Sequence, residues 1–125
     1  MDFVRAGRSL HWTEPAAGPH LWFILSDVDP DTTQVVVVRL VTSRPYTDKT
    51  LSVNVGDHSF IQHESNIDCG SALLLRADKL NEMLNSGEMS LGADMSTRLL
   101  EQARNAVLVS SKTIHFVTKY CRTRW

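Results

Sequence analysis

The stretch that decides the fold is Gln34-Val35-Val36-Val37-Val38-Arg39-Leu40-Val41-Thr42, in a chain of 125 residues. Its β-branched side chains lose rotamer freedom in a helix and pack well on a pleated surface, so the run favours a strand. Its apolar residues do not alternate with polar ones, which is typical of a strand buried on both faces. We therefore expect residues 34–42 to form the central strand of a sheet.

Further strands are predicted on both sides of this run. Leu21-Trp22-Phe23-Ile24-Leu25 is aromatic and branched, and turn-forming residues follow it at 26–31. Leu51-Ser52-Val53-Asn54-Val55 alternates strictly between apolar and polar residues, which predicts a half-buried strand. A short strand at 72–75 and a closing strand at 113–120 complete the predicted set.

Two short helices are predicted in the second half of the chain. Apolar residues recur at helical spacing over 77–84, and Asn85-Ser86-Gly87 supplies a stop. A second apolar stripe covers 95–107, with Asp94 or Ser96 available as the N-cap. Both stripes are expected to face the core.

These elements predict a mainly β fold, a β-rich α+β domain in which a small, partly closed antiparallel barrel carries two short helices. An open sandwich is the alternative. The length fits one domain. We expect residues 1–19 to be a partly ordered lead-in, because they contain Gly and Pro without periodicity, residues 20–121 to be the barrel, and residues 122–125 to be a basic tail.

Composition narrows the classes of function. Thirteen basic and 14 acidic residues give a formal net charge of −1, so any recognition of phosphate must be local. The longest nearly apolar run, residues 35–41, is far shorter than the roughly 20 residues of a membrane helix, and no apolar signal core follows the N-terminus. The two cysteines argue against a disulfide framework. We expect a cytoplasmic protein without a membrane partner.

Side chains capable of chemistry are concentrated between Gly56 and Cys69. His58 and His63 lie five residues apart there, and a turn could bring their imidazoles into one pocket. Because histidine titrates near neutrality, such a pair could take a proton from a ribose 2′-hydroxyl and give one to a leaving 5′-oxygen without a metal. The alternative is that one or both imidazoles are turn residues bonded to the backbone.

Neighbouring polar residues are predicted to assist this pair. Thr42 and Ser43 end the central strand, where their hydroxyls could grip a phosphate, and Arg44 adds a guanidinium. Solvated strand-end residues would look the same. Asp57 could contact the substrate or only shape a turn, and Ser65 could fix a turn or offer a hydroxyl to a phosphate.

Two other kinds of site are compatible with side chains of the same stretch. Cys69 could be a nucleophile supported by a histidine, although a cysteine beside an apolar strand is more often a small buried residue. Asp57, His58, His63 and Asp68 could hold a metal, but their spacing matches no standard zinc or calcium motif. No metal and no cofactor is therefore predicted.

Three segments taken together resemble small bacterial proteins of the PemK/MazF-like toxin kind. They are residues 20–26, the valine-rich run 35–38 leading to Thr42-Ser43, and the GDHxFIxHxS stretch at 56–65. The resemblance covers roughly residues 20–110 and implies an SH3-like or CcdB-like barrel. It also implies a metal-independent ribonuclease that cuts single-stranded RNA, forms a homodimer, and is silenced by a cognate antitoxin occupying the RNA groove.

The residues of that family carry over unevenly. The strand-end hydroxyls of the family are kept here as Thr42-Ser43, whereas Thr32-Thr33-Gln34 stands where better-known members have a strand-entry arginine. Arg39, Arg44 or the histidines would have to take over that role. Three hypotheses follow: a ribonuclease toxin, a non-catalytic RNA- or protein-binding module on the same barrel, and a hydrolase using the histidine and cysteine cluster.

Overall fold

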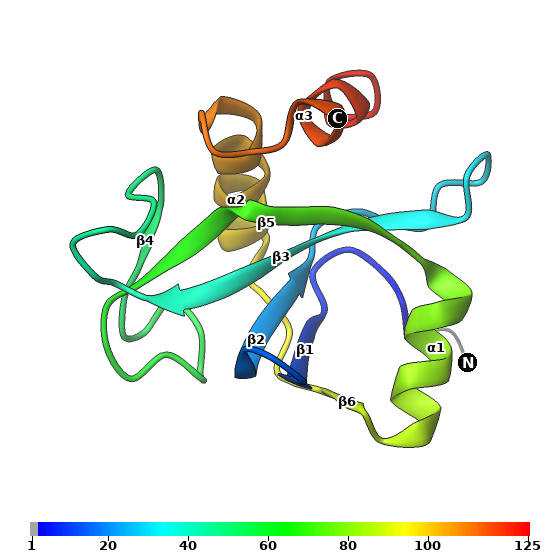
Figure 1. The fold of residues 1–125 in the computed structure, drawn as a ribbon, viewed down its shortest axis with the longest axis horizontal. Helices are drawn as coiled ribbons and strands as arrows, with labels where there is room; N and C mark the ends of the chain where they lie inside the picture. The colour runs from blue at the N-terminus through cyan, green and yellow to red at the C-terminus, as the bar shows by residue number, and fades with distance from the viewer. Residues whose placement is uncertain (1–2) are drawn as a thin grey trace.

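A six-stranded antiparallel sheet lies at the centre of residues 3–125, the part of the chain that the computed structural model describes. The strand order across the sheet is β4-β5-β3-β2-β1-β6 (Figure 1). The strands are β1 (Ser9–Glu14), β2 (Gly18–Ile24), β3 (Gln34–Thr42), β4 (Ser52–Val53), β5 (Ser65–Arg76) and β6 (Met89–Leu91).

The predicted central strand is confirmed as β3, which pairs with β2 on one side and β5 on the other. Val36, Val38 and Leu40 belong to a core cluster on one face of the sheet, while Val35 and Val37 belong to a second cluster on the other face. The unbroken valine run thus reflects burial on both faces, because successive side chains of a strand point to opposite sides.

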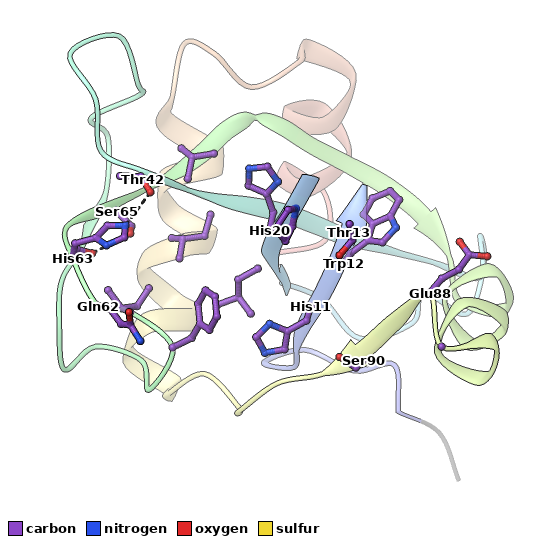
Figure 2. A pocket seen from close by; sticks show the side chains of 17 residues that line it. His11, Trp12, Thr13, His20, Thr42, Gln62, His63, Ser65, Glu88 and Ser90 are labelled. Atoms are coloured by element: carbon purple, nitrogen blue, oxygen red, sulfur yellow. Dashed lines mark hydrogen bonds between the residues drawn. The ribbon is translucent and has the colours of Figure 1, made fainter. Parts of the chain in front are cut away.

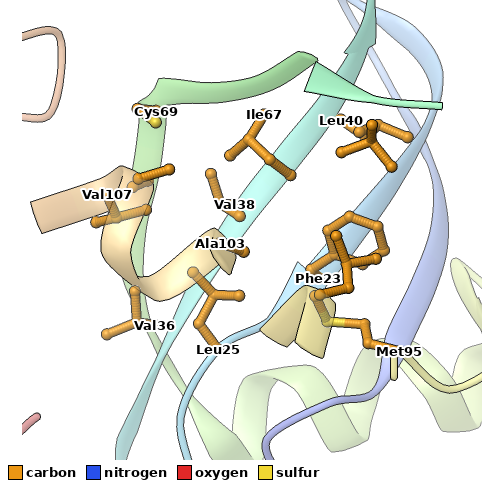
Figure 3. Packing of buried hydrophobic residues seen from close by; sticks show 14 of the residues in the cluster. Phe23, Leu25, Val36, Val38, Leu40, Ile67, Cys69, Met95, Ala103 and Val107 are labelled. Atoms are coloured by element: carbon orange, nitrogen blue, oxygen red, sulfur yellow. The ribbon is translucent and has the colours of Figure 1, made fainter. Parts of the chain in front are cut away.

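Three helices cover these two faces. They are α1 (Ala77–Ser86), α2 (Thr97–Val109) and α3 (His115–Arg122). Leu80 and Met83 of α1 join one cluster, whereas α2 and α3 cover the opposite face. Figure 3 shows Ala103 and Val107 of α2 packed over the β-sheet beside Val38 and other buried side chains.

Both predicted helices are confirmed, together with the residues that begin and end them. The Ser96 hydroxyl accepts a hydrogen bond from the Leu99 backbone N–H at 3.0 Å, as an N-cap does. Gly87 ends α1 with a φ of 85°, a left-handed conformation that glycine adopts without a Cβ penalty.

The predicted barrel is only partly right. The sheet is mainly antiparallel, as expected, but hydrogen bonds do not close it, because β4 pairs only with β5 and β6 pairs only with β1. These edge strands have two and three residues, and so few backbone groups cannot form a closing ladder. Residues 3–125 also contain three helices and not the two predicted.

The predicted closing strand at 113–120 is wrong, since α3 begins at His115. The run Thr113 to Tyr120 is rich in β-formers, but strand propensity depends strongly on context. Val117 and Cys121 lie one helical turn apart and are both buried against the core, whereas Phe116 is exposed. Packing through one helical stripe therefore overrides local propensity.

Three strands also differ in extent from the prediction. β1 lies within residues 1–19, the predicted lead-in, and pairs with β2 along its whole length. β4 covers only Ser52–Val53 of the predicted 51–55 strand. β5 reaches back to Ser65, well before the predicted start at residue 72. Polar residues such as Asn66 and Asp68 interrupt its apolar pattern, which concealed this extension in the sequence.

The last residues of the chain are attached to the fold. Arg122 ends α3, the Arg124 guanidinium donates to the Asp29 carboxylate, and Trp125 packs against the larger core cluster. The basic tail predicted at 122–125 thus makes specific contacts. No helix in residues 3–125 has the length and apolar character that crossing a bilayer requires.

Candidate functional site

A groove of about 570 Å³ opens where β3 ends and β2 begins. Figure 2 shows side chains from β1, β2, the end of β3 and the 60–65 segment pointing into it, with Glu88 and Ser90 at one end. Its lining comprises His11, Trp12, Thr13, Pro19, His20, Leu21, Leu40, Val41, Thr42, Phe60, Ile61, Gln62, His63, Ser65, Gly87, Glu88 and Ser90. Three imidazoles and several hydroxyls therefore share one cavity.

His63 lies over the end of the central strand. Its Nε2 is 2.9 Å from the Thr42 hydroxyl (Figure 2), and Thr42 pairs with Ser65 in the ladder between β3 and β5. The Ser65 hydroxyl donates to the His63 carbonyl at 3.1 Å, which fixes the backbone on which the imidazole stands. His63 itself is exposed to solvent. An accessible imidazole and a hydroxyl are thus in direct contact in the groove.

His20 is a second groove imidazole, and a carboxylate orients it. Its Nδ1 lies 3.2 Å from Glu14 Oε2 and 3.3 Å from the Gly18 carbonyl oxygen. Because both partners only accept, Nδ1 carries a proton, and in the neutral tautomer of this ring Nε2 is the acceptor. The Trp22 indole N–H also donates to Glu14 at 3.3 Å. A histidine with its tautomer set by a carboxylate is suited to accept a proton.

His11 gives the groove an aromatic floor. Its ring meets that of Phe60 edge to face, with centroids 4.9 Å apart. Gly92 makes room for it, since a Cβ at that position would stand 2.8 Å from His11 Nε2. Neither His11 nor His20 was selected from the sequence as a site residue. Their place in the groove depends on the pairing of β1 with β2, and β1 lies in the predicted lead-in.

His58, the other member of the predicted catalytic pair, lies outside the groove that contains His63. It is 6% exposed. Its Nε2 lies 2.8 Å from the Ala93 carbonyl oxygen and 2.9 Å from the Ser9 hydroxyl, while Nδ1 accepts from the Phe60 backbone N–H at 3.1 Å. Both ring nitrogens are therefore engaged with the scaffold, and the alternative of a histidine bonded to the backbone holds for His58.

Several solved structures are similar to this fold over most of the chain. One is an endoribonuclease in complex with its cognate antitoxin from a Mycobacterial species, with a TM-score of 0.53 and 20% identity over 82% of this chain and 89% of that chain. Two are forms of MazE-MazF from Deinococcus radiodurans, each with a TM-score of 0.54. Their identities are 17% and 15%, over 85% and 84% of this chain and 93% and 94% of those chains. The chain has a MazF-like fold.

This similarity of fold confirms the resemblance to MazF-like proteins that the GDHxFIxHxS stretch and its neighbouring segments indicated. It holds at low sequence identity, so the chain is a divergent example of the MazF-like fold. The sequence matches no protein-family model and no curated protein sequence.

Arg39 and Arg44, the two arginines that could replace the strand-entry arginine of the family, differ in their surroundings on this MazF-like fold. Arg39 is held by Asp68 at 2.9 Å and Glu14 at 3.6 Å, so its charge is already neutralised. Arg44 is exposed beside Ser43 in a shallow cavity that also includes Thr42 and His63. Of the two guanidiniums, that of Arg44 is the one free to meet an anion.

Two other predicted residues have structural partners. The Asp57 carboxylate accepts from the Asn54 backbone N–H at 2.7 Å and so shapes the turn, which is the simpler of its two predicted roles. The Ser43 hydroxyl accepts from Lys49 Nζ at 2.8 Å, which ties it to the loop that follows β3.

The cysteine alternative finds no support in the surroundings of Cys69. The thiol is buried, and this burial, with the nearby Asp48 carboxylate, raises the pKa of Cys69 to about 12. The thiolate, which is the nucleophilic form, is therefore suppressed near neutral pH. Within residues 3–125 no group of three or more His, Cys, Asp or Glu side chains is arranged to hold a metal.

Proposed function

We propose that this chain is a toxin-like, metal-independent endoribonuclease that acts on single-stranded RNA. The observation that carries the proposal is one groove containing both the His63–Thr42 contact and the Glu14-oriented His20, on a MazF-like fold. Two imidazoles and a hydroxyl in one groove could supply the base, the acid and the phosphate contact that RNA cleavage needs.

In the proposed reaction His20 Nε2 takes the proton from a ribose 2′-hydroxyl. The 2′-oxygen forms a bond to phosphorus while the bond from phosphorus to the 5′-oxygen breaks. Protonated His63 gives its proton to that leaving oxygen, and Thr42 turns its hydroxyl to a non-bridging phosphate oxygen. The products are a 2′,3′-cyclic phosphate and a free 5′-hydroxyl, so atoms and charge balance without a metal.

The remaining predicted site residues have supporting roles in this proposal. Arg44 and Ser43 contact the phosphate from the strand end, and Ser65 holds the His63 backbone. Arg39 keeps Glu14 in place beside His20, while Asp57 and His58 shape the segment that carries His63. Arg39, Asp57, His58 and Ser65 are positioning residues, because their side chains already bond to other parts of the protein.

The proposal includes partners of the kind seen in structures with this fold. Those structures contain a cognate antitoxin or MazE bound to the toxin. We propose that a cognate antitoxin protein covers the groove here, that the chain forms a homodimer, and that it works in the cytoplasm. Size-exclusion chromatography with light scattering measures the dimer, and a monomer at micromolar concentration would contradict that part.

A non-catalytic RNA- or protein-binding module is the second candidate. It is favoured by Arg39, whose guanidinium is held by Glu14 and Asp68 and so is not available to stabilise charge that develops in a cleavage reaction. It predicts saturable binding of single-stranded RNA without any shortening of the strand.

The deciding experiment incubates purified protein with labelled single-stranded RNA in the presence of a metal chelator. We expect internal cuts whose upstream products end in a 2′,3′-cyclic phosphate. Binding without cuts would favour the binding module, and cuts that require an added divalent cation would contradict the proposed mechanism.

A further inference from the structure

A second groove, of about 530 Å³, adjoins the first. The two share His20, Val41 and Thr42, so they meet at the end of β3 where the proposed scissile phosphate lies. The second groove continues along the loop after β3 and is bordered by Arg44, Tyr46 and Lys112, among others. A polymer crossing the proposed cleavage site would pass from one groove into the other.

Two cations in this second groove have no acidic partner within residues 3–125. Arg44 and Lys112 are exposed and make no side-chain ion pair there. By contrast, the carboxylate of Asp68 is paired with Arg39. The Asp48 carboxylate accepts from the Ser110 hydroxyl at 2.6 Å and the Thr50 backbone N–H at 2.9 Å. Unpaired positive charge therefore faces the groove.

An aromatic ring stands beside these cations. Tyr46 is 85% exposed, so most of its ring is open to solvent. The loop that carries it is firmly held: the Thr47 hydroxyl donates to Asn66 at 2.7 Å, and Lys49 Nζ donates to Ser43 at 2.8 Å. An exposed ring on a hydrogen-bonded loop, beside unpaired cations, is an arrangement that can bind a base by stacking and its phosphate by charge.

We propose that the second groove binds the nucleotide next to the scissile phosphate. The base of that nucleotide stacks on Tyr46, and its outer phosphate contacts Lys112. The inference rests on the proposed function for the location of the cut, but binding at this subsite does not require that the RNA be cut.

The test measures binding of a fluorescent 2′-O-methyl RNA ten nucleotides long, which cannot be cut through the 2′-oxygen. We expect Tyr46→Ala to weaken binding on the order of tenfold, since a stacked base is lost. Lys112→Gln should lower the slope of log affinity against log salt by about 0.7, the value for one phosphate contact on a single strand. Phe116→Ala and Lys119→Gln, exposed residues of α3 outside both grooves, are the matched controls and should behave as wild type.

Each outcome has a defined meaning. Unchanged affinity and slope in Tyr46→Ala and Lys112→Gln, with RNA still cut, would overturn the subsite and leave the ribonuclease standing. If the wild type never cuts RNA but the two variants bind RNA more weakly than it does, the subsite is supported and the ribonuclease is refuted. If the wild type binds no RNA, or if the variants weaken binding of an acidic peptide and not of RNA, the groove is no nucleotide subsite.

Discussion

His58 and His63 stand five residues apart, yet one is buried in the scaffold and the other is exposed in the groove. The first holds together Ser9, Phe60 and Ala93 through both ring nitrogens, whereas the second contacts Thr42. Loss of the two side chains should therefore have different consequences for the molecule.

We expect His58→Ala to lower the free energy of unfolding by about 2 to 4 kcal/mol, because it leaves a cavity and unpaired polar groups. The exposed His63→Ala should change it by no more than about 0.5 kcal/mol. Urea unfolding followed by circular dichroism measures both variants. Equal and small losses would mean that His58 is not the scaffold residue described here.

The two cysteines provide a second test at this scale. Burial raises the pKa of Cys69 to about 12 and that of Cys121 to about 11, so both stay protonated near pH 8. We expect neither thiol to react with Ellman's reagent in the folded protein, and both to react in guanidinium chloride. Rapid reaction of one thiol in the native state would show an accessible thiolate and revive the hydrolase hypothesis.

The sequence identifies single residues of the site only where local patterns suffice. His63 and Thr42 were predictable, because one lies in a polar turn and the other ends an unmistakable strand. His20 was not, because its partner Glu14 becomes its neighbour only through the β1–β2 pairing. The burial of His58 was equally hidden, since Ser9 and Ala93 are distant in the chain.

At the scale of elements, α3 is joined to the turn before β3 by side chains. The Tyr120 hydroxyl donates to the Asp29 carboxylate, and the Arg124 guanidinium both donates to Asp29 and lies 3.8 Å from the Tyr120 ring centroid. Tyr120 and then Arg124 hold the pKa of Asp29 well below its usual range. This contact ties the C-terminal end of the chain to the sheet.

The depressed pKa of Asp29 makes the docking of α3 dependent on pH. The stabilisation is complete above the unfolded-state pKa of about 3.9, and it is lost as pH falls further toward the folded-state value. We expect wild type to be more stable than Asp29→Asn at pH 7 and the difference to shrink below about pH 4. Thermal unfolding across pH measures this, with Asp31→Asn in the same turn as the control. A difference that stayed constant down to pH 2 would contradict the ion pair.

The elements differ in how far the sequence predicts them. α1 and α2 combine an apolar stripe with a local stop or cap, Gly87 and Ser96, so local physics agrees with the fold. α3 has a sequence rich in residues with high strand propensity. It is helical because a helix places Val117 and Cys121 on one buried stripe. Propensity and packing disagree there, and packing decides.

At the scale of the whole molecule, the open sheet determines where a ligand can bind. Helices cover the two core clusters, and the ends of β2 and β3 are left to border the two grooves. The sequence predicted the central strand and the resemblance to the MazF-like fold. Closure of a barrel depends on long-range pairing of the edge strands, which no local pattern specifies. The short β4 and β6 leave the sheet open.

The most direct test of the central claim is single-turnover cleavage of a single-stranded RNA with a metal chelator present. We expect wild type and His115→Ala, which changes an exposed histidine of α3 outside the grooves, to cut at the same rate. His20→Ala and His63→Ala should each be slower by roughly 10²- to 10⁴-fold, the usual contribution of a general acid or base. Equal rates for all four proteins, or no cleavage by wild type, would contradict the account.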